Sequence, residues 1–132
     1  MAAIPDDAKH LFENKSLAHV ATLNPDGSPQ VSAVWVGLDG DLITFNTAEG
    51  RVKPRNVRGD SRIALSIAND ENPYENLLVQ GTVVDVTNDG ADEDIDALAK
   101  RYLDADSYPF RQPGEERVIV KIEPEKIHHM NP

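Results

Sequence analysis

Four basic residues gather in one short segment of an otherwise acidic chain. The formal net charge of the protein is -10, yet the stretch from Gly50 to Gly59 contains no acidic residue after Gly50 and carries Arg51, Lys53, Arg55 and Arg58. Pro54 is well suited to the first position of a helix, where its missing N–H costs nothing. Because free N–H groups at a helix start attract anions, this segment predicts a phosphate cradle. The alternative is a solvated turn whose charges balance acidic neighbours.

The usual catalytic constellations are missing from the sequence. The chain has no cysteine, and it contains no G-x-S-x-G, Rossmann or Walker pattern. Its four histidines are His10, His19, His128 and His129, and their spacing does not match a metal site. We therefore expect no metal, and we expect any reactive group to be supplied by a cofactor.

Composition restricts the class of protein and the class of partner. With 132 residues, the chain is expected to form one domain over its full length, 1–132. Its acidity argues against binding to nucleic acid or to an anionic membrane, since both would be repelled. The N-terminal residues carry acids where a signal peptide requires positive charge, and no apolar run is long enough to span a membrane. The expectation is a cytoplasmic protein with a small anionic ligand.

Alternating apolar residues predict a mostly β protein. We expect six strands, at residues 17–23, 30–38, 41–47, 63–68, 74–87 and 117–122, the last of which can resume beyond Pro124 as far as Met130. The Asp39-Gly40 pair is typical of a type I′ hairpin turn, so the first three strands would form an antiparallel meander. Gly81, inside the fifth strand, indicates a bulge or a close backbone approach.

Two short amphipathic helices frame these strands, at residues 4–14 and 91–104. The basic segment after Gly50 would add a third helical turn. Six mostly antiparallel strands at this spacing close most economically into a small barrel. The predicted fold is therefore a six-stranded antiparallel split β-barrel with two to three short helices.

Four phrases in this order resemble the split β-barrel flavin-binding superfamily, which includes pyridoxamine 5′-phosphate oxidase. They are residues 19–23 followed by 26–29, residues 27–35, residues 50–56 and residues 58–65. The resemblance covers nearly the whole chain. It implies the FMN-binding type of split barrel, a homodimer, and a cofactor bound at the dimer interface.

The pattern Arg51-x-Lys53-x-x-Asn56 is similar to the branch of this superfamily that uses the deazaflavin coenzyme F420, with FMN as the alternative cofactor. The resemblance implies that Arg51, Lys53, Arg55 and Asn56 hold the anionic part of the cofactor. It also implies contacts to the ring system or ribityl chain from Gln30, Ser32, Val34, Trp35, Asn46, Thr47, Asn76 and Leu77. On the sequence alone, core packing accounts for apolar members such as Val34 and Trp35.

The resemblance also implies that the aromatic residues of segment 108–111 could cover the cofactor from the second subunit. Tyr108 and Phe110 are the candidates, and the alternative is that they pack within their own subunit.

The predicted function is an F420-dependent oxidoreductase that transfers hydride to an electron-poor small molecule. The alternatives are a non-catalytic flavin, deazaflavin or haem-binding protein, and an FMN-dependent enzyme resembling pyridoxamine 5′-phosphate oxidase.

Overall fold

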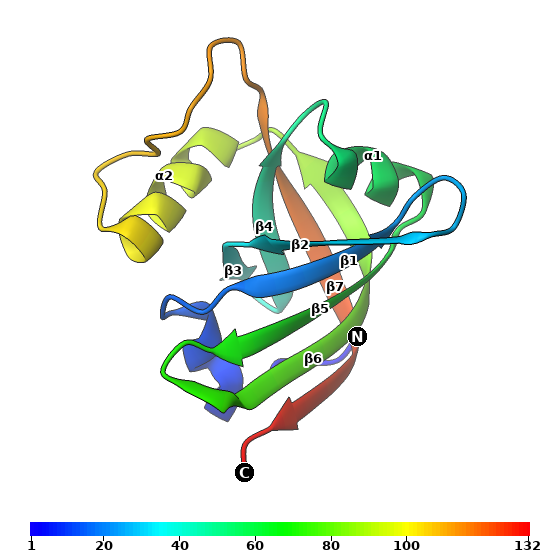
Figure 1. Ribbon diagram of the computed structural model, residues 1–132, viewed down its shortest axis with the longest axis vertical. Coiled ribbons are helices and arrows are strands. Elements are labelled where there is room, and N and C mark those ends of the chain that lie inside the picture. Colours follow the sequence, from blue (N-terminus) through cyan, green and yellow to red (C-terminus); the bar gives the residue numbers. More distant parts are fainter.

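The structure, a computed structural model, describes residues 1–132, and its body is one curled antiparallel sheet. The seven strands lie in the order β2-β1-β5-β6-β7-β4-β3. Their bounds are β1 Ala18–Leu23, β2 Pro29–Val34, β3 Val36–Asp39, β4 Leu42–Ala48, β5 Arg62–Asn69, β6 Asn72–Thr87 and β7 Arg117–Met130. The helices are η1 Asp6–Phe12, α1 Val52–Gly59 and α2 Ala91–Leu103. In Figure 1, α1 and α2 lie at the same end of the molecule, on either side of β4.

The concave side of the sheet holds the core. β1 and β5 alternate buried and less buried residues, as expected of strands with one face against the core. Large aliphatic and aromatic side chains are fully buried there, among them Leu11, Ile43, Phe45, Ile67 and Leu77. Burial of each such side chain contributes about 1.5–3 kcal/mol. This core supports β4, which carries the first residues of the candidate site.

The predicted strand at 30–38 is broken in two, so the sheet has seven strands and not six. β2 ends at Val34 and pairs with β1, whereas β3 starts at Val36 and pairs with β4. β2 and β3 therefore lie at opposite edges of the sheet, and the predicted meander is wrong. At the break, the Val36 N–H donates to the Tyr102 hydroxyl, 3.1 Å away. The alternation of apolar residues continues across Trp35, so it does not reveal that the chain changes edges there.

The hairpin between β3 and β4 is confirmed, but its turn type is not the predicted one. Asp39 pairs with Leu42, so the two-residue loop is Gly40-Asp41. Gly40 has a φ of 60°, and Asp41 is not among the residues with positive φ. A type I′ turn requires positive φ at both central residues, whereas glycine at the first alone fits type II′.

The helices agree with the sequence patterns to within a few residues. The first is a 3₁₀-helix, and α2 ends one residue earlier than expected. α1 begins at Val52, so Pro54 is its third residue and not its first. The position is still harmless, because the first turn of a helix has no internal acceptor for its N–H groups.

Gly81 confirms the predicted close approach between strands. The register between β6 and β7 shifts between Gln80 and Gly81, which pairs with Pro124. A Cβ atom at Gly81 would lie 2.6 Å from the carbonyl oxygen of Glu123. β7 passes through Pro124 without a break and reaches Met130.

Candidate functional site

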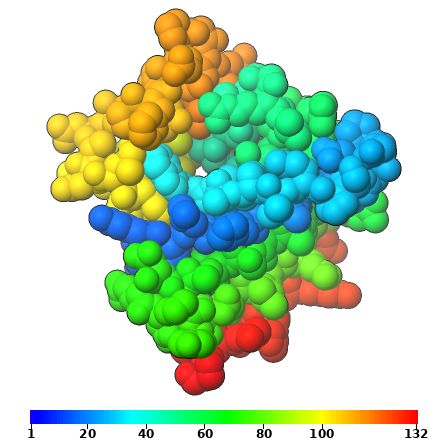
Figure 2. Space-filling model, viewed as in Figure 1, coloured from blue at the N-terminus to red at the C-terminus, as the bar shows by residue number.

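A cavity of about 330 Å³ lies between α1, α2 and the strand ends that face them, and we call it the α1–α2 cavity. Figure 2 shows a hollow at this place, bordered by the surfaces of β2, α1 and α2. The cavity is lined by Leu17, Ala33, Val34, Trp35, Asn46, Thr47, Arg51, Lys53, Ile95, Tyr108, Phe110 and Arg117. Eight of these are predicted site residues: Val34, Trp35, Asn46, Thr47, Arg51, Lys53, Tyr108 and Phe110.

Aromatic rings form one wall of this cavity. Trp35 stacks on Tyr102 with ring centroids 5.3 Å apart, and Tyr108 meets Trp35 edge-on at 6.0 Å. Phe110 continues the row at 5.7 Å from Tyr108. The break between β2 and β3 makes this possible, since it turns Trp35 out of the sheet and toward α2. The result is an apolar wall in which Trp35, Tyr108 and Phe110 stand nearly perpendicular to their neighbours, and such a wall offers both ring faces and ring edges to an aromatic ligand.

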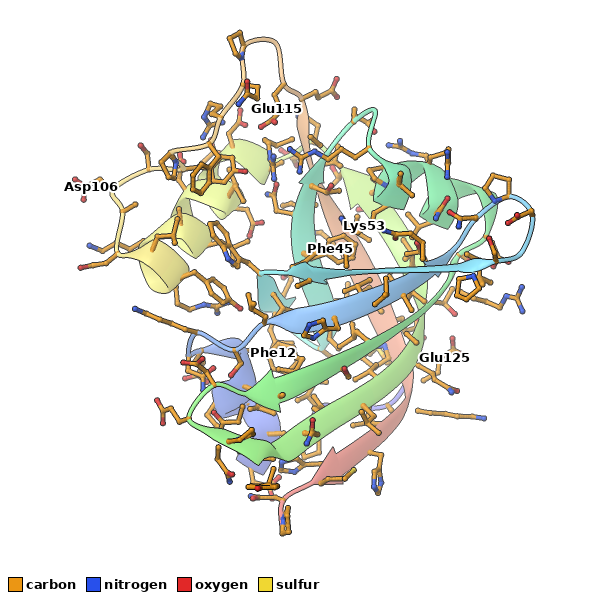
Figure 3. The ribbon with its side chains drawn as sticks, viewed as in Figure 1. Phe12, Phe45, Lys53, Asp106, Glu115 and Glu125 are labelled. Carbon is orange, nitrogen blue, oxygen red and sulfur yellow. The ribbon has the colours of Figure 1, made fainter.

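Lys53 supplies positive charge to the cavity without a carboxylate partner. It reaches from α1 toward β2 (Figure 3), where its Nζ donates to the Ser32 Oγ at 3.1 Å. Burial lowers the pKa of Lys53, and the nearby Arg51 lowers it further. A half-buried ammonium without a counterion has unused capacity to bind an anion.

A second cation of the cavity lining, Arg117, is almost completely buried. The Arg117 side chain is 2% exposed, and its guanidinium lies 4.9 Å from the centre of the Tyr108 ring. Its Nη1 donates to Glu115 Oε1 at 3.0 Å, while the second oxygen of Glu115 accepts from Arg51 at 3.3 Å. Glu115 is thus shared between two guanidinium groups, only one of which is buried.

Asn46 links this network to α2. Its Oδ1 accepts from Arg117 Nε at 2.9 Å, and its Nδ2 donates to Asp94 Oδ2 at 2.9 Å and to the Ala91 carbonyl at 2.8 Å. Burial raises the pKa of Asp94, against the hydrogen bond from Asn46. Since these bonds occupy the amide of Asn46, it acts here mainly to position Arg117.

Thr47, the next residue on β4, has an unsatisfied hydroxyl. The residue is 1% exposed, and its Oγ1 has no hydrogen-bond partner. Leaving a buried polar group unpaired costs about 1–3 kcal/mol. An unpartnered hydroxyl in the wall of a cavity, close to an unpaired cation, fits a site whose remaining polar partner is a ligand.

The rest of the basic segment has a structural role in this chain. Asn56 is buried, and its Nδ2 donates to Thr22 Oγ1 and Asn24 Oδ1, both at 3.0 Å. Its Oδ1 accepts from Arg55. Thr22 in turn donates to Gln30 Oε1 at 3.5 Å. Arg55, Asn56 and Gln30 therefore anchor α1 to β1 and β2 and do not line the cavity.

The predicted pair on β6 lies far from the cavity of its own chain. Leu77 is fully buried in the core and pairs with Ile67 and His129. Asn76 pairs with Ala68 and Met130, at the opposite end of the sheet. Tyr108 and Phe110, in contrast, line the cavity of their own chain, which is the arrangement that the sequence left as an alternative.

Sequence reasoning missed Arg117, Glu115 and Asp94. Arg117 is the first residue of β7 and stands directly before the apolar residues of that strand. This position was the only feature of the sequence that could have identified it as a site residue. No part of the structure groups three or more His, Asp or Glu side chains in a way that could hold a metal ion. His19 and His128 face an outer hollow of the sheet, whereas His129 Nε2 donates to the carboxylate of Glu75, 2.8 Å away.

Comparison with known proteins places this fold in the pyridoxamine 5′-phosphate oxidase family. The profile of the family described as "Pyridoxamine 5'-phosphate oxidase" matches residues 4–131. A solved structure of an F420 reductase is 32% identical, with a TM-score of 0.81 over 95% of this chain and 98% of the other. HupZ of Group A Streptococcus is 21% identical, with a TM-score of 0.69 over 96% and 93%.

A structure described as a putative pyridoxamine 5′-phosphate oxidase from Listeria innocua is 20% identical. Its TM-score is 0.69 over 96% of this chain and 98% of the other. At these lower identities the likeness to HupZ and to the Listeria protein concerns the fold alone.

Neither α1 nor α2 has the length and apolar character that crossing a membrane requires.

Proposed function

The chain belongs to the pyridoxamine 5′-phosphate oxidase family, and on that premise we propose that it is an oxidoreductase that binds coenzyme F420. The single observation that carries this proposal is the α1–α2 cavity, where an aromatic wall, the unpaired ammonium of Lys53 and the unpartnered hydroxyl of Thr47 meet. The 32% identity to an F420 reductase over 95% of the chain supports the choice of cofactor.

Each part of the cavity has a distinct task in this proposal. Trp35 and Tyr108 pack against the planar ring system and keep water from it. Lys53 and Arg51 hold the anionic groups, Lys53 as a point charge and Arg51 through its planar guanidinium. Thr47 donates to, or accepts from, a polar atom of the ligand. Arg117 adds positive charge from beneath the wall without exposure to solvent.

The reduced deazaflavin supplies the hydride when it is bound. The protein contributes orientation, because a fixed ring and a nearby open space hold the acceptor at reacting distance. The acceptor is proposed to be a neutral, electron-poor small molecule such as an enone or a quinone. Charged side chains at the mouth belong to the cofactor's anionic groups, which leaves the aromatic end for an uncharged acceptor.

We also propose a homodimer, formed through the outer face of the sheet. That face has two shallow hollows of about 630 and 560 Å³ with shared lining residues. Val31 and Leu78 expose apolar side chains beside them, 64% and 41% accessible. Pairing of two identical faces would bury these side chains. Asn76 precedes Leu78 on β6 by two residues and lies far from the cavity of its own chain, so a contact from Asn76 to a cofactor would be to the site of the partner subunit, whereas the Leu77 side chain is buried in the core.

The decisive test is a parallel titration of the protein with F420 and with FMN, followed by turnover. We expect F420 to bind and FMN to bind at least ten-fold more weakly, a difference of about 1.4 kcal/mol. Reduced F420 should then be oxidised by an enone or quinone only when the protein is present. Tight FMN binding without F420 binding would overturn the cofactor assignment. F420 binding without turnover of any acceptor would indicate a carrier instead of an enzyme.

A further inference from the structure

The segment that closes one side of the cavity is irregular and is attached at two places. It comprises residues 104–116, which we call the strap, and it links α2 to β7 as the orange loop of Figure 1. Its first half is fixed to α2, because Arg111 pairs with Asp92 and Asp96, each at 2.9 Å, and the Tyr108 N–H donates to Asp96 at 2.8 Å. Its second half is fixed by Glu115 (Figure 3), whose carboxylate accepts hydrogen bonds from Arg117 and Arg51.

The two bonds of Glu115 differ in what they do for the protein. Arg117 is buried and requires a counterion, since an unpaired buried charge is strongly destabilising. Arg51 is 48% exposed, so water can solvate it and the protein does not need Glu115 there. The distances are consistent with this difference, since Glu115 lies 3.0 Å from Arg117 and 3.3 Å from Arg51. The bond to Arg51 is therefore the one that can be exchanged.

Arg51 also lines the cavity together with Lys53, so an anionic ligand bound there would contact both cations. A carboxylate of the protein already occupies part of this position. Because one guanidinium edge cannot serve two anions fully, the ligand and Glu115 compete for Arg51. Gly114, with a φ of 74°, precedes Glu115, so the backbone next to it adopts a conformation that favours glycine.

We propose that Glu115 is an internal anion that occupies the Arg51 end of the binding site, and that a phosphate or carboxylate group of the ligand displaces it. This inference rests on the proposed function only in that the same cavity takes an anionic ligand. Displacement breaks the bond that ties the strap to Arg51 and leaves Glu115 bound to Arg117 alone. Arg117 contacts the ring of Tyr108, which packs on Trp35, so the change is made next to the aromatic wall. Glu115 thereby sets how tightly the site binds anions and whether the strap is tied to Arg51.

Trp35 is the only tryptophan of the chain and lines the cavity together with Arg51, so its fluorescence reports on anion binding there. The probe is inorganic pyrophosphate, titrated into wild-type protein, Glu115→Gln and Glu116→Gln. Glu116 is the matched control, because it is the adjacent residue, is exposed, and loses the same charge. We expect Glu115→Gln to bind pyrophosphate roughly ten-fold more tightly, the effect of removing one charge-assisted competitor. Glu116→Gln should behave as the wild type.

A double variant separates displacement from general electrostatics. If Glu115 competes at Arg51, replacing Glu115 by Gln in an Arg51→Ala background should change pyrophosphate affinity by less than about two-fold. An equal gain in both backgrounds would mean that Glu115 acts only through its charge, and the proposal would be wrong. Unchanged or weaker binding by Glu115→Gln, or no response of Trp35 in any of these proteins, would also overturn it.

Loss of the counterion of Arg117 could prevent Glu115→Gln from folding, so a second variant is included. Glu115→Asp keeps the carboxylate for Arg117 but is one methylene too short to bridge both guanidinium groups. It should raise pyrophosphate affinity with the same dependence on Arg51, and no gain would count against the proposal. Since the probe is pyrophosphate, these results stand even if F420 fails to bind, and F420 binding with no effect of Glu115 would overturn this inference alone.

Discussion

Lys53 carries the largest share of the proposed anion binding at the scale of single residues. Its ammonium has only the Ser32 hydroxyl as a partner, so a ligand anion would form a new charge-assisted bond worth about 1.5–3 kcal/mol. We expect Lys53→Ala to weaken F420 binding roughly ten- to a hundred-fold, measured by titration of cofactor fluorescence. Lys15→Ala, which removes an exposed lysine elsewhere, should leave the affinity unchanged. Equal affinities for the two variants would contradict the role of Lys53.

Thr47 provides a second test at the same scale, because two measurements should move in opposite directions. Thr47→Val keeps the shape of the side chain and removes the unpartnered hydroxyl. The free protein should be as stable as the wild type or more stable, since a buried polar group without a partner is lost. Cofactor binding should weaken about two- to ten-fold, the value of one neutral hydrogen bond. Thermal unfolding and cofactor titration measure the two effects, and unchanged binding would mean that the hydroxyl does not contact the ligand.

Asn56 determines how the α1 element is attached to the sheet. Its amide joins α1 to Thr22 and Asn24 and is buried. We expect Asn56→Ala to lower the free energy of unfolding by about 2 kcal/mol, from two lost hydrogen bonds and the partners left unpaired. Urea denaturation measures this, with Asn76→Ala as a control whose single amide bond, to the Pro73 carbonyl, is 3.3 Å long. A loss of affinity without a loss of stability would instead indicate direct contact with the cofactor.

Glu75 connects distant parts of the whole molecule. Its carboxylate is bound by His10 at 2.9 Å, by His129 at 2.8 Å and by Asn69 at 2.8 Å, which joins η1, β7 and β5 to β6. Asp7 lies 3.7 Å from His129 on the other side of the ring. Burial opposes ionisation of Glu75, but the bonds from His10, His129 and Asn69 prevail and lower its pKa from 4.5 to about 2.

This shift gives stability a defined dependence on pH. A carboxyl group whose pKa is lowered on folding stabilises the native state above its unfolded pKa, and this stabilisation is lost as pH falls through the folded pKa. We therefore expect wild-type stability to decrease between pH 4.5 and pH 2. Glu75→Gln should be less stable at neutral pH by about 1.5–3 kcal/mol and should show a flatter decline in that range. Denaturant titrations at a series of pH values compare the two proteins, and identical slopes would contradict this role of Glu75.

At the scale of the whole molecule, the proposed dimer through the outer face of the sheet can be tested by a substitution on that face. Val31 on β2 is 64% exposed, so a charge placed there is well solvated in a monomer but would be buried in the proposed dimer. Val31→Asp should shift the protein from dimer to monomer in sedimentation velocity at micromolar concentration. The control, Val84→Asp on β6, also replaces an exposed valine, 49% accessible, and should remain dimeric. Dissociation of neither variant would indicate pairing through another face.

The sequence by itself determined the elements and the general character of the site. Alternation and turn residues located the strands, since side-chain burial in a strand has a period of two. The glycine inside β6 indicated its close approach to β7, because a Cβ at Gly81 would lie only 2.6 Å from the carbonyl oxygen of Glu123. The unusual concentration of charge around Lys53 indicated the anion site that we propose, because charge is readable from residue types alone.

Only the tertiary structure decided which of these residues meet. The break at Trp35 sends β2 and β3 to opposite edges of the sheet, and no local pattern encodes the partner that a strand will choose. Arg117 and Glu115 enter the site because β7 pairs with β4 and the strap returns over α2. Asn56 is three residues from Lys53 and lies on the same side of the helix, yet its amide bonds to Thr22 and Asn24 while the Lys53 ammonium bonds to Ser32. Long-range pairing and side-chain direction, which a linear sequence does not display, therefore define the walls of the cavity.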